Sequence, residues 1–219
     1  WTVTWAGGPE LDVFGKGAEI RDGDITPSTT DGTEFDGTVA SGGVTTNTFS
    51  LYNSGTTNLY LTSNPAVSII GGSGFSVVQQ PSTNIGAKAI GTLKIAFDPI
   101  SANTHTATVS IASSDGDEDP YTFVVQGLGI ITASVENLAA SFISSDSARL
   151  NGAVTDTGNE DPVVWIYWGE TDEGTSASAW DTNELVGVGG AGAFSAVIAG
   201  LVSGSTYYYR CLSSNSAGM

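Results

Sequence analysis

Apolar and polar residues alternate along most of this chain, in short runs separated by glycine, proline and polar turn residues. Clear examples are residues 48–52, 92–97, 106–111 and 121–125. Successive side chains of a β-strand point to opposite faces, so alternation with a period of two predicts strands that are buried on one face. Turn signals recur roughly every 8 to 12 residues, which is typical of β-sandwiches. No long stretch has the period of an amphipathic helix, so we predict an all-β fold.

The predicted strands fall into two groups that are divided near residue 132. At 219 residues the chain can hold two domains of about 100 residues, each with its own hydrophobic core. The pattern therefore predicts two tandem β-sandwiches, at residues 9–131 and 132–219. A short N-terminal segment, residues 1–8, precedes them.

The second sandwich is predicted to be incomplete. Its strands are expected at residues 139–143, 148–154, 163–168, 194–198 and 206–212. A seven-stranded sandwich has a further strand after the last of these. Residues 213–219 are a polar segment that does not supply it, so the second sandwich is expected to lack its C-terminal strand.

The alternation is strictest at the N-terminus, in Trp1, Thr2, Val3, Thr4 and Trp5. The odd-numbered side chains share an apolar face, and the two threonines share the other face. A breaker-rich hinge at residues 6–10 separates this segment from the next strand. Burial of the apolar face would remove ~400 to 500 Å² from water, worth about 10 kcal/mol before ordering costs. We interpret residues 1–5 as a free donor strand.

An incomplete sandwich and an unpaired strand suggest that one completes the other, as in pilin donor-strand exchange. The acceptor would be a groove in the second sandwich that is lined by Tyr207, Tyr209 and Cys211. The hinge spans at most about 18 Å, and the whole first sandwich separates the two ends along the chain. This favours transfer to a neighbouring copy, and such a head-to-tail contact builds a filament. We therefore expect a structural subunit whose partners are other copies of itself.

The same pattern has an alternative interpretation. Residues 1–5 could be the last strand of a preceding module, and the chain a repeat or fragment of a large multidomain surface adhesin or carbohydrate-binding protein. The lack of an initiator Met and of a signal peptide fits a mature product or such a segment equally well. The strand pairing would then occur along one polypeptide.

The charge of the chain restricts its partners. The formal net charge is −17, with six Lys and Arg residues. Nucleic acid and anionic membranes are bound through clustered Lys and Arg, so neither is expected as a partner. No run of about 20 apolar residues is present, so membrane insertion is not expected. Acidic surfaces poor in lysine are common on secreted proteins, which favours an extracellular or cell-surface location.

Few residues suggest chemistry. An acidic turn with Asp115, Asp117 and Asp119 could offer oxygen ligands to Ca²⁺. It lacks the spacing of an EF-hand loop and lies at a hairpin position where Asp and Gly are common, which favours a solvated turn. No other cofactor is expected. Cys211 is the single cysteine, so no intrachain disulfide can form, and we expect it to be a buried small hydrophobe.

Catalytic signals are absent from the sequence. His105 is the single histidine and is expected on the surface of a strand. The chain has no phosphate-binding loop, no zinc-ligand spacing and no Gly-x-Ser-x-Gly elbow. The protein is therefore not expected to be an enzyme.

One strand of the second sandwich is apolar on both faces. Trp165 and Tyr167 alternate there with Val164, Ile166 and Trp168. One of these faces belongs to the core. The other, with Trp165 and Tyr167, is predicted to pack between domains or subunits, and the alternative is a sugar-stacking surface.

Three stretches of the first sandwich carry a family resemblance: residues 53–59 (NSGTTNL), 95–99 (IAFDP) and 117–123 (DEDPYTF), the last followed by Gln126-Gly127. On these motifs, residues 10–131 resemble the bacterial choice-of-anchor D family. The immunoglobulin-like fold of that family is related to the ASPM-SPD-2-Hydin domains.

The second sandwich is similar to the fibronectin type III-like modules of large bacterial surface proteins. The motifs are residues 147–152 (SARLNG), 167–169 (YWG), 201–210 (LVSGSTYYYR) and 215–218 (NSAG). Together the resemblances imply two immunoglobulin-like sandwiches with a scaffolding role, and they place Tyr207 at a tyrosine corner. The second sandwich departs from the fibronectin type III-like modules in lacking the last strand.

Overall fold

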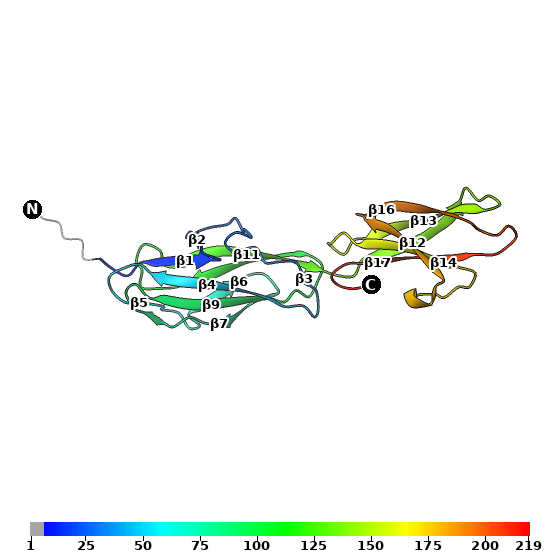
Figure 1. Cartoon of the computed structure of the whole chain (residues 1–219). Coiled ribbons are helices and arrows are strands. Elements are labelled where there is room, and N and C mark those ends of the chain that lie inside the picture. The colour runs from blue at the N-terminus through cyan, green and yellow to red at the C-terminus, as the bar shows by residue number, and fades with distance from the viewer. Residues whose placement is uncertain (1–6) are drawn as a thin grey trace, which may run out of the picture. The chain divides into compact units, whose positions relative to one another are not determined.

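A computed structural model describes residues 7–219, and nearly all of its regular structure is β-strand (Figure 1). The sole helix of this part is the single 3-10 turn η1 (Ala177–Ala179). The chain divides into two compact units, with unit 1 ending at Gly129 and unit 2 running from Ile130 to Met219. The predicted all-β fold of immunoglobulin-like sandwiches is confirmed. The predicted donor strand, Trp1 to Trp5, lies outside the described residues. Within residues 7–219 no helix has the length and hydropathy to span a membrane.

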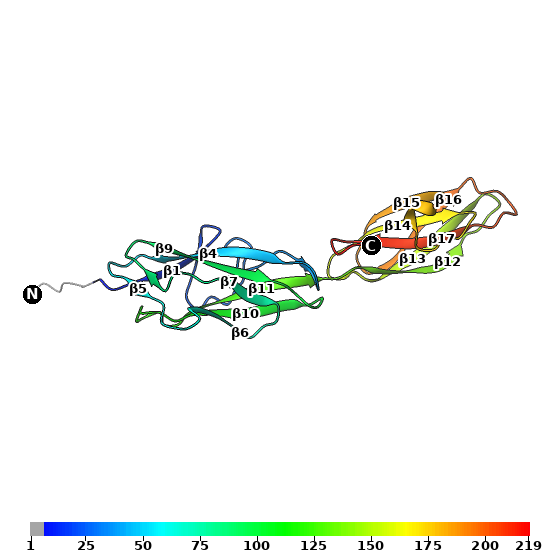
Figure 2. The same cartoon turned by 90° about the horizontal axis from the view of Figure 1, so that it is seen from below.

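Unit 1 is a sandwich of two main sheets, shown from two sides in Figures 1 and 2. One sheet has the order β2-β1-β4-β9-β7: β2 (Ala18–Ile20), β1 (Leu11–Gly15), β4 (Thr45–Asn53), β9 (Ile90–Phe97) and β7 (Phe75–Gln79). The other has the order β3-β11-β10-β6: β3 (Thr38–Val39), β11 (Tyr121–Ile130), β10 (Thr104–Ile111) and β6 (Val67–Ile70). The short strands β5 (Leu59–Tyr60) and β8 (Asn84–Ile85) form a separate pair.

The core of unit 1 follows from the period-two pattern. Alternate residues of β4, β9, β10 and β11 are buried. Among the largest fully buried side chains are Phe49, Phe97 and Phe123. The rings of Phe49 in one sheet and Phe123 in the other lie 5.6 Å apart and join the two layers. Unit 1 is thus a sandwich with one continuous buried core.

His105 belongs to this core, so its expected surface position was wrong. The side chain is only 7% exposed, and its ring packs edge-on against Phe97. Its two ring nitrogens lie 3.2 Å from the Ser73 hydroxyl and from the Ser101 carbonyl oxygen. The polar neighbours in the sequence face solvent, and position 105 takes the inward face of β10.

Unit 2 has two three-stranded sheets. The first has the order β12-β13-β16: β12 (Ser134–Ser141), β13 (Ser147–Asp156) and β16 (Gly192–Ala199). The second has the order β15-β14-β17: β15 (Thr182–Val188), β14 (Val163–Gly169) and β17 (Tyr208–Ser214). Figure 2 shows the strands of this sheet. All pairings in both sheets are antiparallel. No other strand in residues 7–219 pairs with the outer side of β17.

Two strands of unit 2 differ from the expectation. The strand predicted at residues 139–143 was misplaced, because β12 ends at Ser141 and Phe142 has a left-handed backbone, with φ of 49°. The Phe142 ring is exposed and lies 4.5 Å from the guanidinium carbon of Arg149. The strand β15 was not predicted, because most of its residues are exposed and do not alternate.

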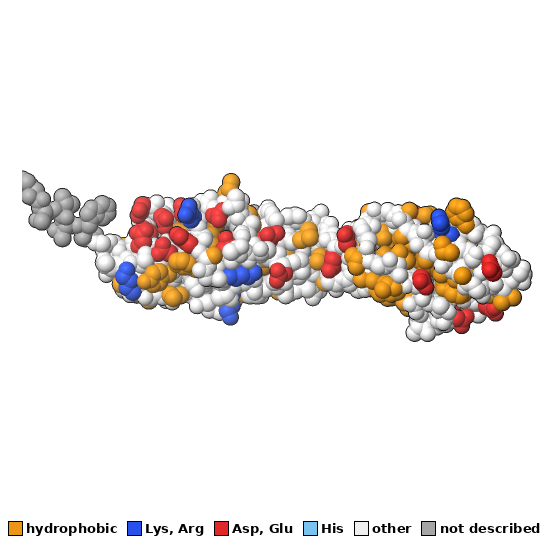
Figure 3. All heavy atoms as spheres, turned by 45° about the horizontal axis from the view of Figure 1, so that its top comes forward, with side chains coloured by type: hydrophobic (Ala, Val, Ile, Leu, Met, Phe, Trp, Pro, Cys, Tyr) orange, Lys and Arg blue, Asp and Glu red, His pale blue; other side chains and the backbone are white. Residues whose placement is uncertain are grey.

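The interior of unit 2 is less completely covered than that of unit 1. Its core cluster contains Ala148, Leu150, Ile166, Ile198 and Cys211. Several larger apolar side chains around this cluster, such as Trp168, Phe194 and Tyr209, are only partly buried. Hydrophobic side chains are visible over much of the face of unit 2 that Figure 3 shows. Part of the apolar interior of unit 2 is therefore uncovered in the described residues.

Candidate functional site: the open edge of β17

The outer edge of β17 offers backbone hydrogen-bonding groups that no neighbouring strand in the described residues uses. β17 pairs with β14 without a register shift, with Cys211 opposite Ile166 and Tyr209 opposite Trp168. Cys211 and Ser213 are buried and Tyr209 is half-buried, so these three residues face the interior. In an antiparallel strand the N–H and C=O groups alternate in step with the side chains. The inward-facing residues therefore direct their backbone groups to the open edge.

The side chain of Asn137 in β12 confirms this direction. Its Nδ2 donates to the carbonyl oxygen of Tyr209 at 2.7 Å, and its Oδ1 accepts from the amide N–H of Cys211 at 2.9 Å. One side-chain amide thus binds the same kind of backbone groups that an adjacent strand would bind. Asn137 covers this part of the edge in the described structure.

A tight turn follows β17. Asn215 and Gly218 form an antiparallel bridge with two backbone hydrogen bonds, 3.0 and 3.1 Å long. The side-chain amide of Asn215 donates to the carbonyl oxygens of Ile131 and Thr157. The amide N–H of Ser216 donates to a carboxylate oxygen of Glu160 at 2.7 Å. Hydrogen bonds from Ser216 hold the Glu160 pKa below its ordinary value. The turn reverses the chain so that it points back along the edge of β17.

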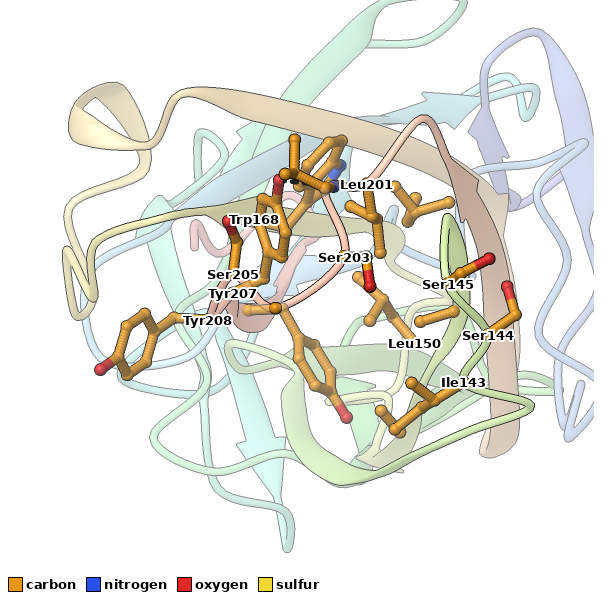
Figure 4. Close-up of a pocket in the computed structure, with 16 residues that line it drawn as sticks. Ile143, Ser144, Ser145, Leu150, Trp168, Leu201, Ser203, Ser205, Tyr207 and Tyr208 are labelled. Carbon is orange, nitrogen blue, oxygen red and sulfur yellow. Dashed lines mark hydrogen bonds between the residues drawn. The ribbon is translucent and has the colours of Figure 1, made fainter.

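At the other end of β17 the interior opens into a cavity of about 290 Å³ (Figure 4). The lining is mainly apolar and includes Leu150, Trp168, Leu201, Tyr207 and Tyr209. The rings of Trp168 and Tyr207 meet edge to face, with their centroids 6.0 Å apart. The buried Nε1 of Trp168 has no hydrogen-bond partner among the described residues. An apolar cavity of this kind takes an apolar or aromatic side chain.

The three predicted groove residues lie at different depths. Tyr207 and Tyr209 line the cavity, whereas Cys211 lies in the core cluster beside Gly152. The Tyr207 hydroxyl accepts a hydrogen bond from the amide of Val202 at 3.2 Å, as the expected tyrosine corner requires. Burial raises the pKa of the Cys211 thiol to about 11. Cys211 is thus a protonated thiol that packs as a small hydrophobe in the core of unit 2.

Tyr209 links the two sheets of unit 2. Its hydroxyl donates to the carbonyl oxygen of Leu138 and lies 3.3 Å from that of Asn151. Burial raises the pKa of the Tyr209 hydroxyl above its ordinary value. The hydroxyl therefore stays protonated and holds β17 to β12 and β13 at the border of the cavity.

The start of the described chain is held to unit 1, although a free hinge was expected there. The carbonyl oxygens of Gly7 and Gly8 accept hydrogen bonds from Thr56, through its hydroxyl at 2.6 Å and its amide at 3.0 Å. Buried Asn53 binds the amides of Glu10 and Gly55 through its Oδ1. Its Nδ2 donates to the carbonyl oxygens of residues 57 and 85. The NSG motif of the sequence therefore anchors the base of the N-terminal segment.

Close packing explains the glycine of this motif. A Cβ atom on Gly55 would lie 2.3 Å from the carbonyl oxygen of Gly8 and 2.6 Å from the amide nitrogen of Glu10. Any side chain at position 55 would push the N-terminal segment away from β4. The motif thus fixes the position of residues 7–10 on unit 1.

The acidic turn gathers a different set of residues than the sequence suggested. Carboxylate oxygens of Glu10, Asp115 and Asp117 lie within 4.8 Å of one another. Asp119 is not in this group, because its carboxylate accepts the amide N–H of Ser113. Glu10 could not be found from the sequence, since it lies more than 100 residues from the turn. These three carboxylates are the described groups that could hold a divalent cation.

The pKa values of several carboxyl groups in and near this cluster are raised. Burial and the charges of Asp115 and Asp117 raise the pKa of Glu10, and burial also raises the pKa of Asp115. Burial, followed by the charges of Asp115 and Glu10, raises the pKa of Glu118 to about 7. Figure 3 shows acidic side chains gathered at this end of unit 1. Burial comes first among the causes of these shifts, and repulsion between the neighbouring acids adds to it.

The predicted interface residues Trp165 and Tyr167 share the outer face of β14. Val164 and Ile166 point into the core, as the alternation indicated. Opposite Trp165 lie Leu185 of β15 and Leu212 of β17. These residues form an apolar strip on the outer face of the sheet. The described residues do not indicate what would cover this strip.

Comparisons with known proteins give no family assignment. No family model matches the chain, and no curated protein matches it. A protein of unknown function from Porphyromonas gingivalis W83 is 20% identical, with a TM-score of 0.40, over 57% of this chain and 49% of that chain. The secreted serine protease VesC from Vibrio cholerae is 8% identical, with a TM-score of 0.37, over 81% of this chain and 44% of that chain.

A third solved structure is the ASH/PapD-like domain of human CEP192. It is 17% identical, with a TM-score of 0.34, over 45% of this chain and 81% of that domain. The chain spans about half the length of the first two proteins. The choice-of-anchor D and fibronectin type III resemblances therefore stay predictions from the sequence, and the site must be interpreted from its own geometry.

Proposed function

We propose that this chain is an extracellular structural subunit that assembles head to tail, with the N-terminal strand of one copy completing unit 2 of the next. The observation that carries the proposal is the open edge of β17, which adjoins an apolar cavity of about 290 Å³. Unpaired edges of this kind recruit further strands. A strand with apolar side chains at alternate positions satisfies the edge and covers the interior together.

Residues 1–5 have the required pattern. Trp1, Val3 and Trp5 would point into unit 2, and Thr2 and Thr4 would face solvent. Two indoles supply large apolar area with few rotatable bonds, which limits the entropy lost on binding. In water the apolar face of this segment would stay exposed, and the free energy of its burial would not be gained.

The geometry of unit 1 favours a neighbouring copy as the acceptor. The chain enters unit 1 at Gly7, beside the turn after β4, and leaves it at the end of β11. β11 has ten residues and is therefore about 30 Å long. Six extended residues span about 20 Å, which is less than the length of unit 1. If the acceptor belongs to a second copy, the segment does not have to span the length of unit 1.

Each copy would then carry one donor and one acceptor, at different places in the chain. A contact between two different surfaces forms a ring only if the rotation between successive subunits closes. Otherwise it forms an open filament, which is the product that we propose. The proposal gives the chain no catalytic role. Its net charge of −17 supports a partner other than nucleic acid or an anionic membrane.

The alternative is a module of a larger bacterial surface protein, such as an adhesin or a carbohydrate-binding protein. The turn at residues 215–218 favours this function, because it already directs the chain back along β17. In a longer polypeptide, residues after Met219 would take the open edge. The outer strip with Trp165 and Tyr167 would then serve as a contact between modules or for a sugar.

A peptide experiment tests the proposed acceptor. A chain of residues 6–219 should stay monomeric and bind a synthetic peptide of residues 1–8. Binding at a hundredfold excess over Kd should raise the Tm of unit 2 by about 10 °C. A peptide with Trp1→Thr and Trp5→Thr is the matched control and should have no effect. Equal effects of both peptides, or no binding by either, would contradict the proposal.

A further inference from the structure

The open edge restricts how a strand can be inserted, and this restriction extends the proposed function. We propose that the incoming strand is antiparallel to β17 and places Trp5 opposite Tyr209, Val3 opposite Cys211 and Trp1 opposite Ser213. The inference rests on the proposed function, since it assumes that residues 1–5 of a second copy are the occupant. It adds the register, and with it the side chain that enters each part of the groove.

The direction follows from the turn after β17. The bridge between Asn215 and Gly218 is antiparallel and follows directly after the end of β17. Asn215 continues the alternation of residues 209, 211 and 213, so its backbone groups point to the same side as theirs. An antiparallel strand continues the hydrogen-bond pattern of that bridge. A parallel strand would have to change the pattern at its first residue.

The faces of the two strands then restrict the pairing. Directly opposite residues in an antiparallel pair point to the same side of the sheet. The inward residues of β17 are Tyr209, Cys211 and Ser213. The apolar residues of the donor must therefore lie opposite these three, and a shift by one residue would place both indoles in solvent.

A shift of the donor strand by two residues along β17 is disfavoured in both directions. Moving Trp1 toward the C-terminus of β17 would place it opposite Asn215, whose amide and carbonyl are already bonded to Gly218. Moving the strand the other way would place Trp5 opposite Tyr207, which precedes β17, and would leave Ser213 unpaired. One register remains, and it uses all three inward residues.

The cavity supports the same register. It lies at the Tyr209 end of β17, where this register places Trp5. Its volume of about 290 Å³ is roughly twice that of an engineered cavity that binds benzene, so it has room for a bicyclic indole. Val3 would face Cys211, where the wall is closed and a smaller side chain fits. Trp5 thus meets the open part of the groove and Val3 meets a closed part.

Asn137 must give way in this register. The amide of Trp5 would donate to the carbonyl of Tyr209, and the carbonyl of Val3 would accept from the amide of Cys211. These are the two backbone groups that Asn137 binds in the described structure. The Asn137 amide therefore acts as a removable cover of the acceptor edge, which protects it from non-specific strand pairing.

The native cysteine allows the register to be tested directly. In a hydrogen-bonded antiparallel pair the Cα atoms are about 5.5 Å apart, within the range that a disulfide needs. Full-length Val3→Cys chains should assemble and then be oxidised with copper phenanthroline. We expect a ladder of multiples of 22.3 kDa in denaturing gels without reductant, which reductant abolishes. Thr4→Cys is the matched control, since its side chain faces solvent and should give no ladder. The double variant Val3→Cys with Cys211→Ser should also give none.

Assembly is measured before oxidation, by sedimentation and negative-stain microscopy, so that the two claims fail separately. If neither wild type nor variant assembles, the proposed function fails. If they assemble and Thr4→Cys gives the ladder, or Val3→Cys gives none, only the register is wrong. Should Val3→Cys itself prevent assembly, a chain with Thr2→Cys and Leu212→Cys gives the same decision, because this register places Thr2 opposite Leu212 on the solvent face. Its expected result is again a ladder, and assembly without one overturns the register.

The role of Asn137 has its own measurement. Asn137→Ala removes the cover but nothing that the assembled state uses, so it should lower the subunit concentration needed for assembly by about tenfold. Asn183→Ala, an exposed residue of β15, is the matched control and should leave that concentration unchanged. An unchanged or higher concentration for Asn137→Ala would show that Asn137 does not compete with the incoming strand.

Discussion

At the scale of single residues, Asn53 shows how one buried side chain supports the N-terminal segment. It is fully buried and binds four backbone groups, two through each end of its amide. Asn53→Ala would leave these groups unsatisfied, so we expect unit 1 to lose about 3 kcal/mol of unfolding free energy. Urea denaturation measures this, with exposed Asn58→Ala as the control. A loss no larger than that of the control would contradict the assigned role.

Glu118 gives a second prediction at this scale, through pH. Its pKa in the folded state is about 7, raised from 4.5 by burial and by neighbouring acids. Between these values the folded protein binds more protons than the unfolded one, so stability falls as the pH rises through 7. Glu118→Gln should therefore stabilise unit 1 relative to wild type more at pH 8 than at pH 5. Thermal unfolding of both proteins at both pH values measures this. An equal difference at the two values would show that Glu118 is not perturbed.

At the scale of elements, the sequence predicted strands best where one face is buried. β14 and β17 were found because their apolar residues alternate or cluster around a core position. β15 is exposed on most of its length, so it has no pattern to detect. The end of β12 depends on the left-handed backbone of Phe142, a residue type that does not signal such a conformation.

The candidate site could be predicted in part for the same reason. Tyr207, Tyr209 and Cys211 carry the alternation of a strand next to a core. Asn137 and Glu10 do not, because each acts on residues far away in the sequence. An asparagine that binds the edge of another sheet, and a glutamate that joins a distant turn, are evident only when the fold brings them together.

Proline substitutions in residues 1–5 give the prediction at this scale. In the proposed register the amide of Val3 points to β17, and that of Thr4 points away. Val3→Pro removes a donor to the Cys211 carbonyl and should abolish assembly, whereas Thr4→Pro should permit it. Sedimentation of the two variants under identical conditions measures the difference. Equal loss of assembly in both would contradict the pairing.

At the scale of the whole molecule, the two units have different roles in the proposed assembly. Unit 1 has a closed core and anchors the base of the N-terminal segment. Unit 2 leaves an edge and a cavity uncovered among the described residues. A subunit built this way would gain part of its stability only in the assembly. We therefore expect unit 2 to unfold at a lower temperature than unit 1 in the chain of residues 6–219, in a calorimetric scan that resolves two transitions. A single transition, or a unit 2 that is more stable than unit 1, would indicate that unit 2 needs no further strand.

In the proposed filament, separate copies are joined by a transferred strand without a covalent link. The most direct test is the intact mass of the polypeptide that is released when natural filaments of this protein are heated in denaturant. We expect filaments in negative stain before heating, and afterwards a polypeptide that carries one N-terminal strand and one copy of each unit. A polypeptide that carries several copies of these units in one chain, or a natural protein that remains monomeric, would contradict strand transfer between separate copies.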